Sequence, residues 1–127
     1  MLHILLVTVR LEKIRPFVEG LSSDPEVCLD QVSSKDKALD IVRSGCPHLV
    51  IVDSGLPDND SLGLVREMIR VNAMVNTTVV SPLSDVDFHD KSEGLGVLCR
   101  LPPDPGGKDA EALLRKLRGI QGIVNQS

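Results

Sequence analysis

Short apolar runs alternate with amphipathic stretches five times along the chain. Three of the runs, ILLVTV, HLVIVD and TTVVS, are almost continuous aliphatic or β-branched residues, which is typical of strands buried on both faces of a sheet. The other two runs are more polar, and the one from Cys28 to Val32 suits an edge strand. The pattern predicts five strands, approximately Leu2 to Thr8, Val27 to Val32, His48 to Asp53, Thr77 to Ser81 and Gly96 to Arg100.

Between the strands, apolar residues recur with the spacing of helices that face a core. Pro16 either distorts the first helix or marks its true start. A helix from about Asp85 to Leu95 is less clearly patterned, because few of its residues are apolar. The other four helices are predicted from the sets Leu11, Ile14, Val18 and Leu21; Ala38, Ile41 and Val42; Leu62, Val65 and Ile69; and Ala110, Leu113, Leu114 and Leu117.

Helix caps support these boundaries, since Ser34 can cap the second helix and either Asp60 or Ser61 the third. Regular alternation of strands and helices predicts an α/β fold, a (βα)5 doubly wound parallel sheet forming one domain over residues 1–127. Ligands of such sheets bind beyond the carboxyl ends of the strands. Those ends carry the candidate site residues Thr8, Val9, Asp53, Ser81, Leu101 and Pro102.

The composition of the chain excludes several classes of function. Hydrophobic residues make up 42% of the chain and charged residues 25%, as in ordinary globular domains. The formal net charge of -4 and the low aromatic content argue against binding to nucleic acid or to an anionic membrane. No apolar run is long enough to span a membrane, and no signal peptide precedes the first strand, so we expect a cytoplasmic protein. The three cysteines, Cys28, Cys46 and Cys99, fit reduced buried thiols better than disulfides or a zinc site.

The segment from His48 to Leu62 reads HLVIVDSGLPDNDSL, a buried strand followed by an aspartate and a Leu-Pro turn that leads into a helix. It resembles the receiver domain of bacterial two-component response regulators, and the likeness covers essentially the whole chain. The resemblance implies a flavodoxin-like sheet with strand order 2-1-3-4-5. It also implies a role in phosphorelay signal transduction rather than catalysis of a metabolic reaction, so we do not expect an enzyme.

The resemblance assigns roles to the strand ends. Asp53 takes the position of the phosphoacceptor, and Ser81 that of the hydroxyl residue that contacts the phosphoryl group. The acidic pair that holds magnesium in the family is replaced by Thr8 and Val9. Leu101 stands where the family has a lysine.

The family's Lys-Pro dipeptide suggests a cis bond before Pro102, although trans is the general expectation. Arg100 could replace the lysine only if its side chain turned toward Asp53, and strand alternation predicts that it points away.

Because these losses remove charge stabilisation from phosphoryl transfer, we expect magnesium binding to be weak or absent, with no cofactor. The leading interpretation is an atypical receiver-like module, a pseudo-receiver, that works by protein contact. A histidine kinase or an output protein would dock on the fourth helix, fifth strand and fifth helix.

Two alternatives remain open. One is a working phosphoswitch in which Asp53 accepts a phosphoryl group from a histidine kinase, and the other is a small flavodoxin-like nucleotide binder or enzyme. Plain structural roles are also open, with Asp53 as a cap of the following loop and Ser81 as a turn hydroxyl. The acidic stretch from Asp85 to Asp90, with His89, is expected to be a solvated helix face rather than a metal site.

Overall fold

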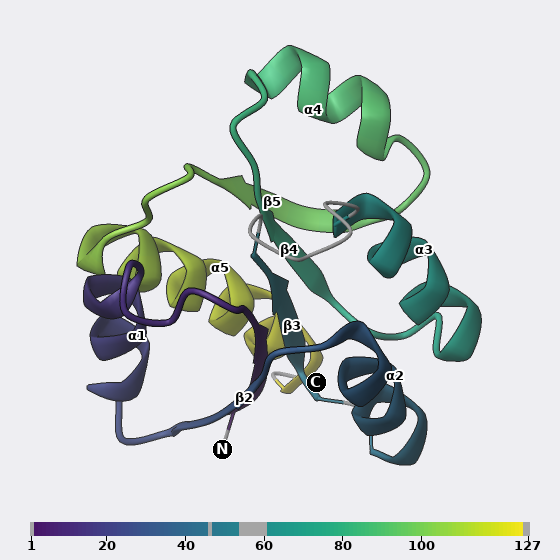
Figure 1. Cartoon of the computed structure of the whole chain (residues 1–127). Coiled ribbons are helices and arrows are strands. Elements are labelled where there is room, and N and C mark those ends of the chain that lie inside the picture. The colour runs from purple at the N-terminus through teal and green to yellow at the C-terminus, as the bar shows by residue number, and fades with distance from the viewer. Residues whose placement is uncertain (1, 46, 54–60, 126–127) are drawn as a thin grey trace.

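The computed structural model describes residues 2–45, 47–53 and 61–125, with side chains as far as Ile120. Five parallel strands form one sheet in the order β2-β1-β3-β4-β5, and a helix follows each strand (Figure 1). The predicted (βα)5 fold and strand order 2-1-3-4-5 are confirmed. The strands are β1 (Leu2–Val7), β2 (Val27–Val32), β3 (Leu49–Val52), β4 (Thr77–Val80) and β5 (Val97–Leu101); the helices are α1 (Arg15–Ser22), α2 (Lys35–Ser44), α3 (Ser61–Val71), α4 (Asp85–Ser92) and α5 (Gly107–Asn125).

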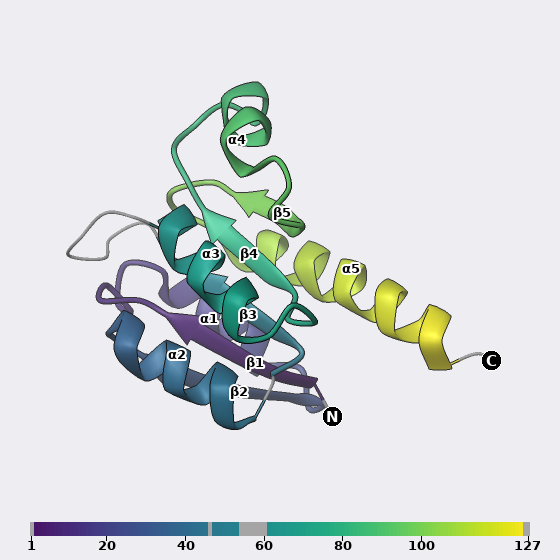
Figure 2. The same ribbon diagram turned by 90° about the vertical axis from the view of Figure 1, so that its right-hand side faces the viewer.

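Helices cover both faces of the sheet. In Figures 1 and 2, α1 and α5 lie on one face, and α2 and α3 lie on the other. Alternation along β1 divides its side chains between two cores: Ile4 and Leu6 pack toward α1 and α5, whereas Leu5 and Val7 pack toward α2 and α3. The central strands β3 and β4 are buried throughout, while β2 is a more exposed edge strand, as predicted.

The first helix is shorter than the apolar spacing predicted. It begins at Arg15, with Pro16 in its first turn, so Pro16 marks the true start of the helix instead of distorting it. Ile14 is buried just before the helix, but Leu11 lies in a turn and is 41% exposed. Including Leu11 on the core face was therefore wrong, since proline favours the first turn and the chain before it is free to turn.

Other boundaries differ by a few residues. Thr8, Asp53 and Ser81 each directly follow a strand rather than ending one, and β5 continues to Leu101. Ser34 caps α2 as predicted, its side chain accepting the Lys37 amide. Ser61 is the first residue of α3, and Asp60, the alternative cap, lies outside the described residues.

Helix α4 ends at Ser92, three residues before the predicted end. The chain leaves the helical conformation at Glu93, with ψ 132°, and the turn that follows contains Gly94 at φ 83° and Gly96 at φ 65°, a left-handed conformation that favours glycine. Phe88 is the one residue of α4 that is buried, and Figure 1 shows the helix beside β5 at the edge of the sheet. A second tie comes from Arg100 of β5, whose guanidinium bonds to Asp85 at 2.8 Å. The attachment of α4 is therefore narrow.

Helices α1 and α5 pack closely because of a glycine. A Cβ built on Gly20 would lie 2.8 Å from the Cβ of Ala110 on α5, and the Gly107 backbone is 3.2 Å away. Nothing lies within 4 Å of the corresponding position at Gly119, which is exposed on α5. No helix in the described ranges is long and apolar enough to cross a membrane.

Replacing each of these two glycines with alanine should therefore change stability in opposite directions. Gly119→Ala should raise the free energy of unfolding by about 0.5–1 kcal/mol, since alanine favours a helix. Gly20→Ala gains the same propensity but forces α1 and α5 apart, and we expect a net loss of about 1 kcal/mol. Urea unfolding followed by circular dichroism measures both changes. Stabilisation by Gly20→Ala would show that the α1–α5 contact is not tight.

Candidate functional site

The carboxyl ends of β1 and β3 meet at one edge of the sheet. Parallel pairing of Val7 with Val52 brings Thr8 beside Asp53, and the Asp53 amide donates to the Val7 carbonyl at 2.9 Å. On the other side, Ser61 at the start of α3 donates its hydroxyl to the Asp53 carbonyl at 3.1 Å. Backbone contacts from two elements thus fix the position of Asp53.

The side chain of Asp53 is fully buried, and so is Thr8. Thr8 Oγ1 donates to Asp53 Oδ2 at 2.6 Å and accepts the Arg10 amide at 3.1 Å. The predicted substitution of an acidic ligand by Thr8 therefore has a definite structural result: the residue is a hydrogen-bond donor to the carboxylate.

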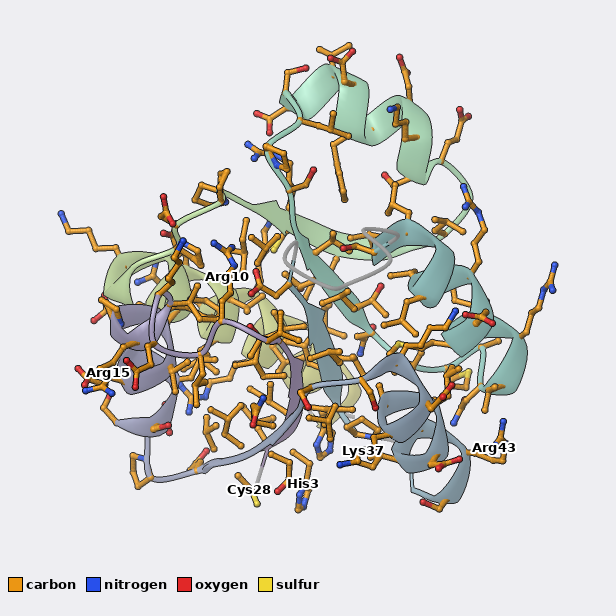
Figure 3. All side chains as sticks on the ribbon, in the orientation of Figure 1. His3, Arg10, Arg15, Cys28, Lys37 and Arg43 are labelled. Atoms are coloured by element: carbon orange, nitrogen blue, oxygen red, sulfur yellow. The ribbon has the colours of Figure 1, made fainter. Side chains whose placement is uncertain are left out.

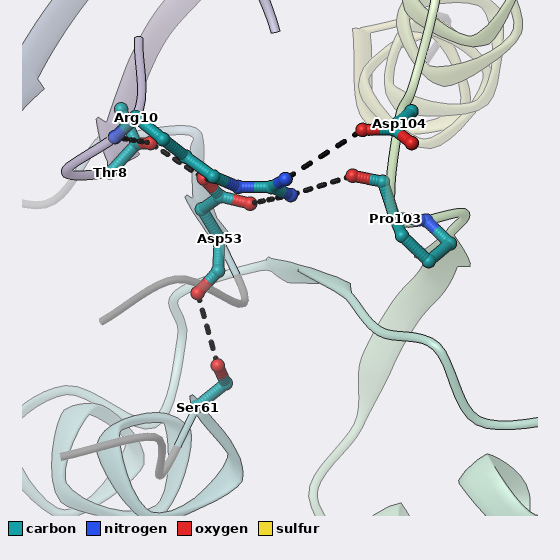
Figure 4. Close-up of polar contacts among 6 residues, drawn as sticks. All are labelled: Thr8, Arg10, Asp53, Ser61, Pro103 and Asp104. Atoms are coloured by element: carbon teal, nitrogen blue, oxygen red, sulfur yellow. Dashed lines mark hydrogen bonds and ion pairs between the residues drawn. The ribbon is translucent and has the colours of Figure 1, made fainter. Parts of the chain in front are cut away.

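Arg10, on the loop after β1, supplies the charge that pairs with Asp53. Its Nε donates to Asp53 Oδ2 and its Nη2 to Asp53 Oδ1, both at 2.8 Å (Figure 4). This two-pronged pairing of guanidinium with carboxylate is the strong form of such contacts. Figure 3 places Arg10 over the carboxyl ends of the strands, whereas His3 and Cys28 lie at the other end of the sheet.

The same guanidinium reaches the loop that follows β5. Arg10 Nη2 donates to the Pro103 carbonyl at 2.6 Å, and Arg10 Nη1 lies 3.7 Å from a carboxylate oxygen of the exposed Asp104 (Figure 4). Arg10 thus ties together three segments: the loop after β1, the residue after β3 and the loop before α5.

Electrostatics favour this arrangement. A buried carboxylate without a partner destabilises the folded state. Arg10, whose side chain is only 20% exposed, donates hydrogen bonds to both oxygens of Asp53. The hydrogen bond to Asp53 raises the pKa of Arg10 above its already high value, outweighing the lowering effect of partial burial. Arg10 is therefore a permanent cation.

The described residues at this edge, Thr8, Val9, Arg10 and Asp53, do not fit a magnesium ion. Mg²⁺ takes oxygen ligands, usually one or two carboxylates. Thr8 directs its hydroxyl proton to Asp53, Val9 is a hydrocarbon with 47% of its surface exposed, and Arg10 binds both carboxylate oxygens of Asp53. A second cation beside Arg10 would be repelled.

Ser81 directly follows β4, the strand that pairs with β3, and Asp53 directly follows β3. The Ser81 hydroxyl accepts the Leu83 amide at 3.2 Å, as in a turn, and makes no hydrogen bond to Asp53. The two residues that the resemblance assigns to phosphoryl contact are thus not hydrogen-bonded to each other, and the role of Ser81 stays a prediction. Leu101 is buried in the core toward α1 and α5.

Two questions at the end of β5 concern the peptide bond before Pro102, cis or trans, and the direction of the Arg100 side chain. The bond before Pro102 is trans, since no cis peptide occurs in the described residues, so the suggestion of a cis bond was wrong. Arg100 donates to Asp85 and to the Ser81 carbonyl, as expected for a side chain that points away from Asp53. Arg100 therefore does not replace the missing lysine.

The acidic stretch of α4 behaves as a solvated face. Asp85, Asp87, His89 and Asp90 are all exposed, and the part of the chain that the structure describes contains no group of three metal-binding side chains.

The role of Arg10 was not predicted from the sequence, although one signal pointed to it. A basic residue three positions after the end of β1 could reach a buried acid on the adjacent strand, and Thr8 and Val9 provide no acidic pair beside that acid. Sequence alternation could not show this, because Arg10 lies on a loop whose path is set by tertiary contacts.

The two described cysteines, Cys28 and Cys99, lie within strands β2 and β5 rather than at this edge. Cys28 and Cys99 are free, half-buried thiols, and Cys46 lies outside the described residues. Burial raises the pKa of Cys99 above its usual value, more than the hydrogen bond with Thr78 lowers it. The thiol therefore stays protonated at neutral pH.

Alkylation should reveal this environment. A raised pKa leaves less thiolate at any given pH, so we expect Cys99 to react more slowly with iodoacetamide in the folded chain than in urea. Its rate should also rise at a higher pH. Peptide mapping after timed alkylation measures both. Identical pH profiles in the folded and unfolded chains would contradict the prediction.

Comparison with known proteins bears on the fold. The chain matches no protein-family model and no curated protein. It is similar to the signal receiver domain of an HD domain-containing protein from Pseudomonas fluorescens, with 20% identity, a TM-score of 0.79, and coverage of 98% of this chain and 92% of that one. It is also similar to a CheY-like receiver domain protein from Methanospirillum hungatei, with 15% identity, a TM-score of 0.79, and coverage of 96% and 98%.

A third similar structure is a response regulator from Burkholderia pseudomallei with a phosphorylated aspartic acid, calcium ion and citrate. It shares 15% identity and a TM-score of 0.73, and the match covers 96% of this chain and 72% of that one. These identities are too low to carry function from one protein to another, but the agreement extends over nearly the whole chain. The resemblance is confirmed at the level of architecture: this chain has the fold of a response-regulator receiver domain.

Proposed function

We propose that the chain is a receiver-like signalling module in two-component signal transduction that acts by protein contact, with Asp53 held by Arg10 instead of being phosphorylated. The observation that carries this proposal is the two-pronged contact between the Arg10 guanidinium and both Asp53 oxygens. In this arrangement Asp53 is a structural anchor rather than a nucleophile.

The chemistry of phosphoryl transfer supports this reading. Transfer depends on positioning and on cations that stabilise the phosphoryl oxygens. The attacking carboxylate oxygen must also have an open approach. Here Asp53 is fully buried, Thr8 and Arg10 donate to its oxygens, and Leu101 offers no charge. A phosphoryl group at Asp53 would have to displace Arg10.

Arg10 also accounts for how the module can act without phosphorylation. In the family that the chain resembles, a metal ion and a lysine bring positive charge to the phosphoacceptor. Arg10 brings one fixed positive charge to the same carboxylate and reaches the Pro103 carbonyl beside α5. The loop before α5 is thus held in one arrangement at all times, and a partner would recognise that arrangement.

We place the docking face on α4, β5 and α5. Its partner would be a histidine kinase or an output protein. The domain of residues 1–127 would present this face continuously, with binding controlled by the presence of the partner rather than by a covalent mark. A ligand or partner shifts a conformational equilibrium only through differential affinity, so a fixed loop favours one binding state.

The phosphoswitch alternative requires that a kinase open the Arg10–Asp53 pair during transfer. The similar response regulator from Burkholderia pseudomallei carries a phosphorylated aspartic acid. In this chain the bonds from Arg10 and Thr8 argue against the same state.

Acetyl phosphate, a small phosphoryl donor, tests the proposal. The full chain is incubated with acetyl phosphate and Mg²⁺, and intact mass spectrometry follows any adduct, beside a receiver that accepts phosphoryl groups and beside Asp53→Asn. We expect the other receiver to gain a hydroxylamine-sensitive adduct and this chain to gain none. A stoichiometric adduct that Asp53→Asn abolishes would overturn the proposal in favour of the phosphoswitch.

A further inference from the structure

A cavity of about 490 Å³ lies between α3, β4 and α4, and its lining includes Ser61, whose hydroxyl bonds to the Asp53 carbonyl. Its volume is within the range of small-ligand sites. Figure 1 shows α3 and α4 as separate helices, with α4 connecting the carboxyl end of β4 to the start of β5. The described residues that line it are Ser61, Leu62, Arg66, Val79, Val80, Ser81, Pro82, Leu83, Phe88 and Lys91.

Two positive charges belong to this cavity. Arg66 comes from α3 and Lys91 from α4, and both side chains are exposed. Neither makes an ion pair or a hydrogen bond to a side chain of the described residues, and no acidic residue stands among the described lining. In a chain with a formal net charge of -4, two unpaired cations at one cavity create a local positive field.

The interior of the cavity differs from its rim. Phe88 is buried and Leu83 half-buried, so the cavity has an apolar wall. Ser81 is also buried, and its hydroxyl accepts the Leu83 amide while its own proton has no acceptor in the described chain. A wall of this kind with a few convergent polar groups is characteristic of a site for organic molecules.

We propose that this cavity binds a small organic anion, a compound with a ring or other apolar body and one phosphate or carboxylate group. The body packs against Phe88 and Leu83, and the anionic group lies between Arg66 and Lys91, where the Ser81 hydroxyl can donate to it. This binding goes beyond the function proposed above, since it requires neither Asp53 nor a protein partner. It would also strengthen the narrow attachment of α4.

Amide NMR of the full, isotope-labelled chain tests the site with four probes. Phenyl phosphate and benzoate carry a ring and an anion, inorganic phosphate carries the anion alone, and benzyl alcohol carries the ring alone. We expect saturable shifts at Ser81, Leu83, Phe88 and Lys91 with at least one ring-bearing anion. Affinity for the two single-feature probes should be lower by about tenfold or more. Comparing the affinities of phenyl phosphate and benzoate shows which anionic group the site prefers.

Charge removal supplies the matched comparison. The variant Arg66→Gln/Lys91→Gln alters two exposed side chains of the cavity and should weaken binding about tenfold or more. Lys37→Gln/Arg70→Gln removes the same charge from exposed positions outside the cavity and should bind as the parent does. Well-dispersed spectra confirm that both variants fold.

Three results would overturn the proposal. The first is the absence of a saturable shift with either ring-bearing anion. The second is binding by inorganic phosphate or benzyl alcohol as tight as that of both ring-bearing anions. The third is equal binding by the two double variants.

Discussion

Replacing Arg10 with methionine should lower the free energy of unfolding by about 3 kcal/mol. Methionine keeps much of the arginine's length but donates no hydrogen bond, so Asp53 is left as a buried charge with Thr8 as its side-chain donor. Breaking a buried ion pair from one side typically costs about 3–5 kcal/mol. The lower end applies here because Arg10 is 20% exposed. Urea unfolding followed by circular dichroism measures the loss, since the chain has no Trp or Tyr for fluorescence.

A double-mutant cycle separates the ion pair from simple loss of packing. Replacing both partners of a buried pair with apolar residues is often close to neutral, so Arg10→Met/Asp53→Leu should recover at least about half of the stability that Arg10→Met loses. Asp53→Leu alone should cost less than Arg10→Met, because the Arg10 guanidinium keeps the Pro103 carbonyl. If the two single losses simply add in the double variant, Arg10 and Asp53 do not form the pair described here.

The second large effect concerns magnesium. The variant Thr8→Asp/Arg10→Met places a new carboxylate beside Asp53 and removes the resident cation, which gives Mg²⁺ two carboxylate ligands. Ligand binding to the folded state alone stabilises it by about 2.7 kcal/mol at one hundred times the Kd. We therefore expect the unfolding midpoint of this variant to rise steeply with Mg²⁺ concentration, whereas the parent midpoint stays constant.

Sodium chloride and the parent chain provide the controls for that comparison. A rise that sodium chloride at the same ionic strength reproduces would reflect screening of the two carboxylates rather than a metal site. Magnesium-dependent stabilisation of the parent itself would contradict the conclusion that Arg10 occupies the position of the cation.

Most of the fold could be predicted from the hydrophobic pattern. Runs such as LVIV of β3 and TTVV of β4 are buried throughout, and such continuous apolar or β-branched sequences indicate central strands. The polar residues of β2 likewise indicated an edge. The pattern was wrong at Leu11, because its spacing matches Ile14 and Val18 on a helix that in fact begins after it.

The candidate site was less predictable, and the reason is physical. Thr8 and Asp53 come together because strand register determines their distance, and that register follows from the buried runs. Arg10 lies beyond the strand, and its side chain crosses to two other segments, Asp53 and the loop at Pro103. Contacts between a loop arginine and distant segments leave no periodic signal.

The proposed loss of the metal site and the contact between Arg10 and Asp53 share one explanation. A buried carboxylate must be neutralised or solvated, and Thr8 and Val9 offer no carboxylate that would help to hold a metal ion beside it. Arg10 meets this requirement permanently. Retention of Asp53 is then explained by its contacts with Thr8, Arg10 and the start of α3, without any phosphoryl chemistry.

The most direct test of this account is an amide NMR titration of the parent chain with Mg²⁺ and then with beryllofluoride, a mimic of the phosphoryl group. The account predicts that resonances of Thr8, Asp53, Ser81 and β5 stay in place at saturating reagent, because Arg10 holds the Asp53 carboxylate. Saturable shifts of these resonances that vanish in Asp53→Asn would contradict it and would show that Asp53 can still accept a phosphoryl group.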